Sequence, residues 1–150
     1  MAVAYYNSPI GILKISASDT AVTSISFEQE TGSDTPNAYT TACIAQLKEY
    51  FNGTRQTFTI PTAPSGTPFQ VKVWQALSTI PYGETRSYQD IAIQCGNRKA
   101  SRAIGMANNR NPIPILIPCH RVIGKSGKLV GYAGGLPIKE YLLELEKKLK

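Results

Sequence analysis

Hydrophobic and polar positions alternate in three short segments at the start of the chain. These segments are residues 2–6, 11–17 and 21–27, and each is rich in β-branched and aromatic residues. Polar turn sequences containing Asn, Ser, Pro and Asp separate them. Because strict alternation is typical of half-buried strands, the pattern predicts an antiparallel β-meander.

A helical period follows in residues 40–51, where Ile44, Leu47 and Phe51 fall on one face. Asn52 and Gly53 form a stop signal directly after it. Cys43 lies near the apolar face, so we interpret it as a core residue. Residues 56–60 are expected to form an edge strand. Nothing in this part resembles a catalytic set, and we interpret residues 1–62 as an α/β scaffold domain.

Residues 61–67 contain two prolines and a glycine and are the best candidate for a linker. Pro68 suits the first position of a helix. The apolar stripe of that helix is Phe69, Val73, Leu77 and Ile80, while Trp74 lies off the stripe and could pack against another element. Residues 63–150 are therefore expected to form a second, mostly helical domain.

Two short helices are predicted around Gly96. The first opens on Ser87, which begins a capping-box sequence, and the second is expected to be capped by Asn97. The predicted apolar stripe of the second helix is Ala100, Ala103, Ile104 and Ala107, and its other face carries Arg98, Ser101, Arg102, Gly105 and Asn109. A basic face with small residues favours a helix-turn-helix that approaches DNA, although an ordinary helical hairpin gives the same pattern.

The segment 113–122 is apolar, is stiffened by two prolines and ends on a thiol, an imidazole and a guanidinium. Alternating isoleucines predict an extended, buried segment that holds Cys119 in place. His120 is the only histidine in the chain. Since adjacent side chains in an extended segment point apart, a water between Cys119 and His120 is more plausible than direct contact. The alternative is a small buried cysteine beside a satisfied histidine.

The remaining chain contains a glycine-rich loop, residues 124–135, and a closing helix that begins near Pro137. We interpret the loop as a flexible wall or lid beside a pocket. The predicted buried stripe of the helix is Ile138, Tyr141, Leu142, Leu145 and Leu149. Lys139 and Glu146 lie together on the edge of that stripe. Such a carboxylate usually belongs to a solvated flank, but Glu146 could also reach inward and orient His120.

Composition narrows the class of protein. The sequence is 42% hydrophobic, which is enough for a core, and it has no apolar run long enough to suggest a membrane span. Its start lacks the basic residues of a signal peptide. Three cysteines without a close pair argue against a disulfide framework and a cysteine-based zinc site, so we expect a reducing, cytoplasmic location.

The net charge of +6 is unevenly distributed. Residues 1–62 carry a charge of −2, and residues 63–150 carry +8. The second part is therefore expected to bind a polyanion. The lysines at 147, 148 and 150 weaken this inference, because basic residues also favour the C-terminal end of a helix dipole.

Several sequence blocks occur together in one order: Ser87-Tyr88, Ser101-Arg102-Ala103, Asn111-Pro112, Pro118-Cys119-His120-Arg121-Val122, Tyr132 with Gly134-Gly135, and Glu146. Together they resemble the O6-alkylguanine-DNA alkyltransferase family over residues 69–146. The resemblance implies an α/β (α+β) fold, with a small ribonuclease H-like domain of a β-meander and a helix before a mostly helical DNA-binding domain with a helix-turn-helix.

The same resemblance implies a role for individual residues. Cys119 would be the nucleophile and alkyl acceptor, activated by His120 and Glu146. The other implied catalytic residues are Tyr88 and Lys139. The implied pocket residues are Asn111, Val122, Tyr132 and Ala133, and the implied DNA-binding residues are Ser87, Ser101, Arg102, Ala103 and Gly105. The implied partner is double-stranded DNA containing O6-alkylguanine or O4-alkylthymine, bound by a monomer that uses no cofactor or metal and transfers each alkyl group once, irreversibly.

The chain departs from the family pattern at Ala133, where many members have serine, so a side-chain contact is lost there. The first 60 residues match only in general layout, and ligands for the metal site of some relatives are missing. Two other functions remain open. One is a DNA-binding module with an incidental thiol, and the other is a cysteine hydrolase, although no oxyanion motif is evident.

Overall fold

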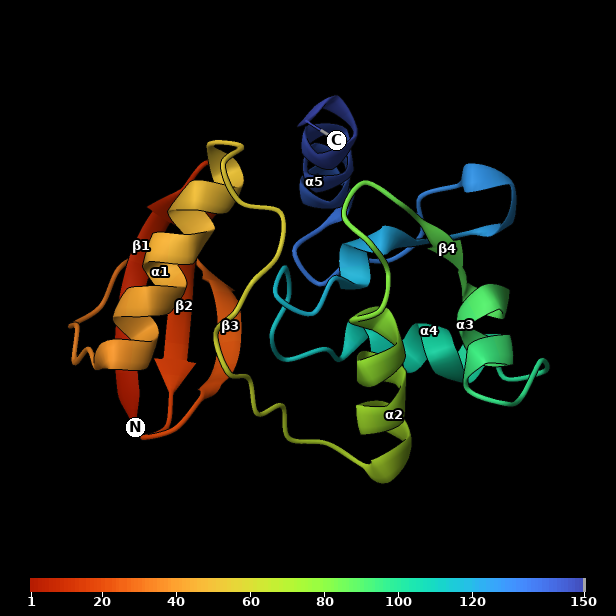
Figure 1. Ribbon diagram of the computed structural model, residues 1–150, viewed down its shortest axis with the longest axis horizontal. Coiled ribbons are helices and arrows are strands. Elements are labelled where there is room, and N and C mark those ends of the chain that lie inside the picture. Colours follow the sequence, from red (N-terminus) through yellow and green to blue (C-terminus); the bar gives the residue numbers. More distant parts are fainter. Residues whose placement is uncertain (150) are drawn as a thin grey trace. The chain divides into compact units, whose positions relative to one another are not determined.

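The computed structural model describes residues 1–149 and divides into two compact units. The first is Met1–Ser65 and the second begins at Gly66. This division falls inside the proline-rich segment, a few residues after the predicted boundary at residue 62. Each unit is described by itself below (Figure 1).

The first unit contains the predicted antiparallel meander. Strands β1 (Ala2–Ser8), β2 (Gly11–Ala17) and β3 (Val22–Glu28) pair in the order β1-β2-β3. The apolar members of the alternation lie on the buried face. Ala4 pairs with Ile15, which pairs with Ile25 on its other side, and all three side chains are buried.

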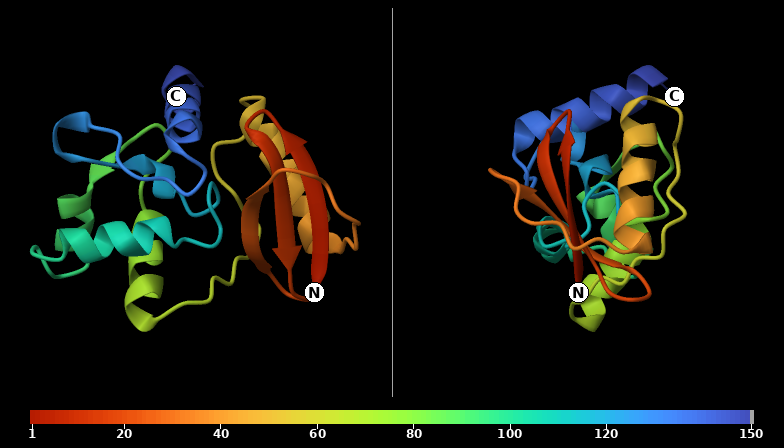
Figure 2. Two further views of the ribbon diagram at one scale, coloured as in Figure 1. Left: turned by 180° about the vertical axis from the view of Figure 1, so that it is seen from behind. Right: turned by 90° about the vertical axis from the view of Figure 1, so that its left-hand side faces the viewer.

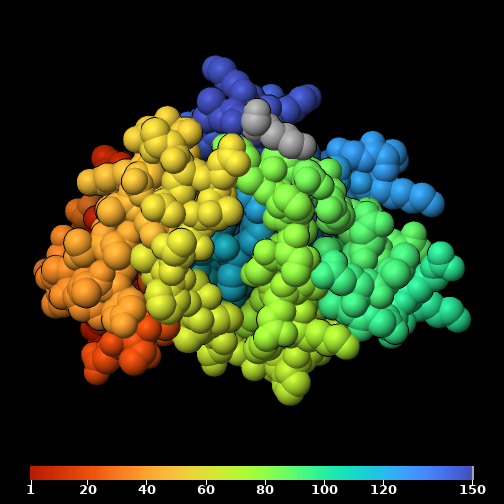
Figure 3. All heavy atoms as spheres, viewed as in Figure 1, coloured from red at the N-terminus to blue at the C-terminus, as the bar shows by residue number. Residues whose placement is uncertain are grey.

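Helix α1 (Ala38–Phe51) covers one face of this sheet. In the space-filling view of Figure 3 the helix hides most of the strands. In the left view of Figure 2, which shows the molecule from behind, the strands lie in front of the helix. Asn37 caps it through Tyr39 and Thr40, so the helix begins two residues earlier than predicted. Its buried residues are Thr40, Cys43, Leu47 and Tyr50. The core position of Cys43 is confirmed.

The predicted edge strand at residues 56–60 is wrong, because these residues form bends and irregular backbone. Side chains take the hydrogen bonds that a neighbouring strand would take. Gln46 accepts from the backbone N–H of Thr59 and donates to its hydroxyl, and Arg55 donates to the carbonyl of Thr57. Only Thr62, beyond the predicted strand, forms an isolated bridge with Val22.

The second unit is built around three helices, α2 (Pro68–Leu77), α3 (Tyr88–Gln94) and α4 (Ser101–Asn109), which contact one another. Pro68 occupies the first turn of α2 as predicted. Trp74 is buried and donates from Nε1 to the carbonyl oxygen of Ala107 at 2.9 Å. The indole that lies off the stripe of α2 therefore joins α2 to the end of α4.

The predicted pair of helices around Gly96 is confirmed, but the start of α4 is not. Ser87 and Asp90 form the expected capping box on α3, and Gly96 has φ +87° in the turn. Asn97 caps the turn by accepting from Lys99, so α4 begins later, after Ala100, without a side-chain cap. The predicted stripe also shifts, because α4 buries Ile104, Ala107 and Asn108 and leaves Ala103 exposed.

The segment before Cys119 is not extended as predicted. Pro114 and Ile117 form an isolated bridge across a tight turn, and Ile115 adopts φ 76°. A left-handed conformation is unfavourable for a β-branched residue and persists where the surrounding structure imposes it. Ile115 is buried, so packing imposes it here. The chain then forms a 3₁₀ turn at Cys119–Arg121 and pairs β5 (Val122–Ile123) in parallel with β4 (Arg86–Ser87).

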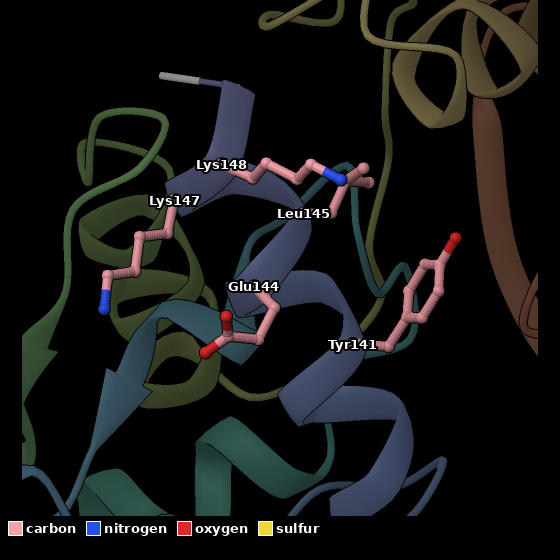
Figure 4. A pocket seen from close by; sticks show the side chains of 5 residues that line it. All are labelled: Tyr141, Glu144, Leu145, Lys147 and Lys148. Atoms are coloured by element: carbon pink, nitrogen blue, oxygen red, sulfur yellow. The ribbon is translucent and has the colours of Figure 1, made fainter.

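The last helix, α5 (Leu136–Leu149), buries a different face from the one predicted. Its buried residues are Lys139, Leu142 and Glu146, whereas Tyr141 and Leu149 are exposed. A hollow along this helix is lined by Tyr141, Glu144, Leu145, Lys147 and Lys148 (Figure 4). The stripe prediction is wrong because the partners of Lys139 and Glu146 lie elsewhere in the chain.

Among residues 1–149, no helix is long and apolar enough to cross a membrane. The predicted fold class, a small α/β domain followed by a mostly helical domain, is confirmed.

Candidate active site

Cys119 begins the 3₁₀ turn and its side chain is buried. Burial raises the pKa of its thiol to about 11, although the Asn111 side chain and the Lys139 charge act in the opposite direction. A thiol with this pKa is protonated at neutral pH. The site therefore needs a base before Cys119 can act as a nucleophile.

Glu146 is the centre of a buried charged cluster. The Nε2 atom of His120 lies 2.6 Å from Glu146 Oε2. Arg121 donates from Nε to Oε1 at 2.8 Å and from Nη2 to Oε2 at 3.0 Å. The backbone N–H of Gly83 donates to Oε1 at 3.2 Å. The interpretation of Glu146 as a solvated flank is thus wrong, and its side chain contacts His120 as the inward alternative requires.

The charges in this cluster set the protonation of His120. Burial alone would raise the pKa of Glu146, but hydrogen bonds and charges from His120 and Arg121 hold it well below its usual range. Burial lowers the pKa of His120, and Glu146 only partly opposes this. A neutral imidazole facing a carboxylate carries its proton on Nε2. Nδ1 is then left as a proton acceptor.

Arg121 itself is held from three sides. Besides Glu146, its Nη1 donates to the carbonyl of Ile80 at 2.7 Å, and the guanidinium lies 5.7 Å from the ring centroid of Tyr82. Its rigid fork matches a carboxylate in a way that lysine could not. Sequence reasoning noted the guanidinium of Arg121 but gave it no role, because its partner is 25 residues away.

Lys139 is completely buried and is bound to the glycine-rich loop. Its Nζ donates to the carbonyls of Val122 at 2.6 Å, Val130 at 2.9 Å and Gly131 at 3.2 Å. Burial lowers the pKa of the amine to about 8, and the charge of Cys119 opposes this shift. Lys139 therefore ties the loop to the chain directly after the Cys119 turn.

Two asparagines connect the end of α4 to the Cys119 segment. Asn111 accepts from the N–H of Ile113 at 3.0 Å and donates to the carbonyl of Ile117 at 2.8 Å. Asn108 donates from Nδ2 to the carbonyl of Cys119 at 3.3 Å. Sequence reasoning singled out Asn111 and missed Asn108, whose helical position gives no signal of a partner.

The pocket side of the site contains two tyrosines. The Tyr88 hydroxyl donates to the carbonyl of Val130 at 2.8 Å, so Val130 accepts from both Tyr88 and Lys139. Burial raises the pKa of Tyr132 well above its usual value, and the charges of Cys119 and Glu146 add to this shift. Val122 is buried in β5, whereas Ala133 is exposed in the loop.

The residues expected to contact DNA lie on and beside α3 and α4. One surface hollow is lined by Ser87, Tyr88, Gln89, Ser101 and Lys125. Arg102 and Ala103 are exposed on α4, and Ala103 lines a second hollow with residues of α2. Gly105 faces the Tyr88 ring, since a Cβ there would lie 3.7 Å from it. Lys125 was missed by sequence reasoning because the loop separates it from the helices.

Comparison with known families and structures gives matches along the whole chain. Residues 1–64 match the ribonuclease-like domain of 6-O-methylguanine DNA methyltransferase, and residues 68–148 match its DNA binding domain. The chain is 47% identical to the constitutive methylated-DNA–protein-cysteine methyltransferase of Bacillus subtilis, with 95% of each chain covered.

Two further relatives have the same name, methylated-DNA–protein-cysteine methyltransferase. The chain is 49% identical to the methylated-DNA–protein-cysteine methyltransferase of Mycobacterium leprae, covering 94% of this chain and 89% of the relative. A Methanosarcina acetivorans relative is 63% identical, but the match spans only 67% of this chain and 65% of that protein.

The crystal structure of Mycobacterium tuberculosis OGT in complex with DNA superposes with a TM-score of 0.91 at 45% identity, covering 99% of this chain and 94% of that one. Both family models, these identities and this superposition agree: the chain belongs to the 6-O-methylguanine DNA methyltransferase family, also named the methylated-DNA–protein-cysteine methyltransferases.

Proposed function

We propose that this protein repairs DNA by moving the alkyl group of O6-alkylguanine to the Sγ atom of Cys119, once per protein molecule. The observation that carries the proposal is the buried hydrogen bond between His120 and Glu146. His120 directly follows Cys119, whose thiol is also buried. O4-alkylthymine is a second substrate of the same chemistry, because it also presents an alkyl carbon on an exocyclic oxygen.

The first step is removal of the thiol proton. With Nε2 bonded to Glu146, His120 offers Nδ1 as the base. A water passes the Cys119 proton to Nδ1, and Sγ keeps the electron pair of the broken S–H bond. Glu146 holds the tautomer and stabilises the imidazolium that forms, as the third member of a hydrolytic triad does.

The second step is substitution at the alkyl carbon. The thiolate forms an S–C bond to the alkyl carbon as the bond between that carbon and O6 breaks. The electron pair of the broken C–O6 bond stays on O6 and leaves with guanine. Tyr88 donates a hydrogen bond or proton to the departing base. Since its hydroxyl bonds to Val130 in this structure, it must exchange that partner for the base. Lys139 lowers the pKa of the Cys119 thiol and holds the loop that forms the pocket wall.

Delivery of the base requires DNA binding and extrusion. A base inside the duplex stack cannot be reached by a buried thiol, so the nucleotide must flip. The positive charge of residues 63–150 and the exposed residues of α3 and α4 support binding to the DNA backbone. In this proposal Arg102 enters the space that the flipped base leaves.

The product explains why each molecule acts once. S-alkylcysteine is a thioether, which offers no activated carbonyl for water to attack. The reaction therefore consumes the protein together with the lesion.

The test is intact-mass measurement after incubation with duplex DNA that contains one O6-methylguanine. We expect a mass gain of one methyl in place of one hydrogen, located on the Cys119 peptide and not on those of Cys43 or Cys95. Cys119→Ala should bind the DNA and gain no mass. Unmodified protein with retained DNA binding would instead indicate a binding module with an incidental thiol, and repeated turnover would indicate a different reaction.

A further inference from the structure

Asn108 combines deep burial with an unmet hydrogen-bonding atom. The residue lies at the end of α4 and is 2% exposed. Its amide orientation follows from its partner, because only Nδ2 can donate to the carbonyl oxygen of Cys119. Oδ1 is buried and has no hydrogen-bond partner among the described residues. Leaving an amide oxygen without a partner in the interior is unfavourable, so such an atom points to a bound group.

A second unmet atom belongs to the same peptide region. His120 Nδ1 is also buried and has no partner in residues 1–149. Asn108 binds the carbonyl oxygen of the peptide bond between Cys119 and His120, so its amide lies beside the backbone from which the His120 side chain extends. Both are acceptors, since Nε2 of His120 carries the proton that faces Glu146.

We propose that Asn108 is a positioning residue for proton removal from Cys119: its Oδ1 and His120 Nδ1 together hold the water that receives the thiol proton. A water has two hydrogens, one for each acceptor, and its oxygen accepts from the thiol. Buried waters typically make about three hydrogen bonds to otherwise unsatisfied groups. The proton leaves Sγ for the water as the water's own proton passes to Nδ1, so the water is regenerated.

This arrangement also gives α4 a direct connection to the nucleophile. Asn111 contacts the segment before Cys119, whereas Asn108 contacts Cys119 itself. The helix that carries Arg102 therefore orients both the backbone of the nucleophile and the water that activates it.

The inference rests on the proposed alkyl transfer, and it is tested with free O6-benzylguanine, which needs no DNA binding or base flipping. The variant is Asn108→Leu, which has a similar size and lacks both amide groups. We expect the alkylation rate of Cys119 to fall about tenfold near neutral pH, because proton transfer is then poorly aligned. The difference in alkylation rate between Asn108→Leu and the unchanged protein should become smaller as the pH rises from about 6 to about 9. At higher pH, hydroxide can remove the thiol proton without the bound water.

Two further variants separate this role from a structural one. Asn108→Asp keeps an acceptor oxygen and, when protonated, a donor to Cys119, so it should recover most of the rate at the acidic end. Asn7→Leu changes an exposed asparagine of β1, in the first unit, and should leave the rate and pH profile unchanged. If Asn108→Leu does not fold, Asn108→Ala and the iodoacetamide reactivity of Cys119 give the same comparison.

An equal loss at every pH, or no loss at all, would overturn the role of Asn108. Failure of the unchanged protein to be alkylated would instead contradict the proposed function. The two failures are therefore distinguishable in one experiment.

Discussion

Helices α1 and α5 have the same length but bury opposite kinds of side chain. Helix α1 packs Cys43, Leu47 and Tyr50 against a sheet. Helix α5 buries Lys139 and Glu146 on either side of Leu142. The first helix is stabilised by removal of apolar surface from water, whereas the second must pair charges that are unfavourable to bury alone.

The difference indicates where function lies. A buried ion pair is seldom better for stability than apolar residues of similar volume, so stability alone does not explain its presence. Both buried charges of α5, Lys139 and Glu146, have several partners, and apart from the N–H of Gly83 these partners lie in the Cys119 turn and in the chain directly after it. Helix α5 thus organises the Cys119 turn and the chain after it, while α1 completes the core of the first unit.

The largest loss of stability is expected from Glu146→Gln. This variant leaves the guanidinium of Arg121 buried without its counter-charge, and breaking such a pair typically costs about 3–5 kcal/mol. Chemical denaturation measures the free energy of unfolding. The alkylation rate of Cys119 should also fall, because the imidazole of His120 loses its orienting carboxylate. Glu144→Gln, on the exposed side of α5, is the matched control and should change neither quantity.

The same carboxylate makes the stability of the protein depend on pH. The pKa of Glu146 is lower in the folded protein than its ordinary value of 4.5, so the unfolded chain binds a proton first as the pH falls. The contribution of Glu146 is therefore complete above about pH 4.5 and is lost below it. We expect the stability difference between the unchanged protein and Glu146→Gln to shrink below this pH. A constant difference would contradict the assigned ionisation.

Leu47→Ala should produce a loss of about 2–5 kcal/mol, because it leaves a cavity in the core of the first unit. Unlike Glu146→Gln, it should show no acid-dependent component beyond that of the unchanged protein. Urea denaturation at two pH values separates the two cases. If the stability of Leu47→Ala depended on pH differently from that of the unchanged protein, acid dependence would not be specific to the buried charges of α5.

Lys139→Met should cost about 1–3 kcal/mol, since the carbonyls of Val122 and Gly131 lose a buried donor. The loop should become more open, and hydrogen exchange of residues 124–135 should accelerate. Lys148→Met removes an exposed lysine of the same helix and is expected to alter neither measurement. Unchanged exchange in Lys139→Met would show that the loop is held by other contacts.

Arg102→Ala should change stability least, by less than about 0.5 kcal/mol, because its side chain is exposed. Its effect should appear instead in repair. If Arg102 offsets the unstacking of the flipped nucleotide, the variant should react more slowly with duplex O6-methylguanine than the unchanged protein and equally fast with free O6-benzylguanine. Equal losses on both substrates would remove this role.

Local patterns predicted much of the fold correctly. Alternation located the three strands, and the Ser87 capping box and the glycine at 96 located the two helices of the DNA-binding unit. Periodicity failed on α5, because a helical period reports which residues are apolar and cannot report that Lys139 and Glu146 have buried partners. It also failed before Cys119, where packing forces Ile115 into a conformation that its own propensity disfavours.

The sequence by itself determined the order of the main helices and strands, the charge difference between the two parts and the adjacency of Cys119 and His120, because these depend on neighbouring residues. Only the tertiary structure decided which groups contact these two residues. Asn108 and Glu146 reach the Cys119 turn from other parts of the chain, and Arg121, inside that turn, binds Glu146 across 25 residues of sequence. A polar group is buried where it can form hydrogen bonds, and its partners come within hydrogen-bonding distance only when the chain has folded.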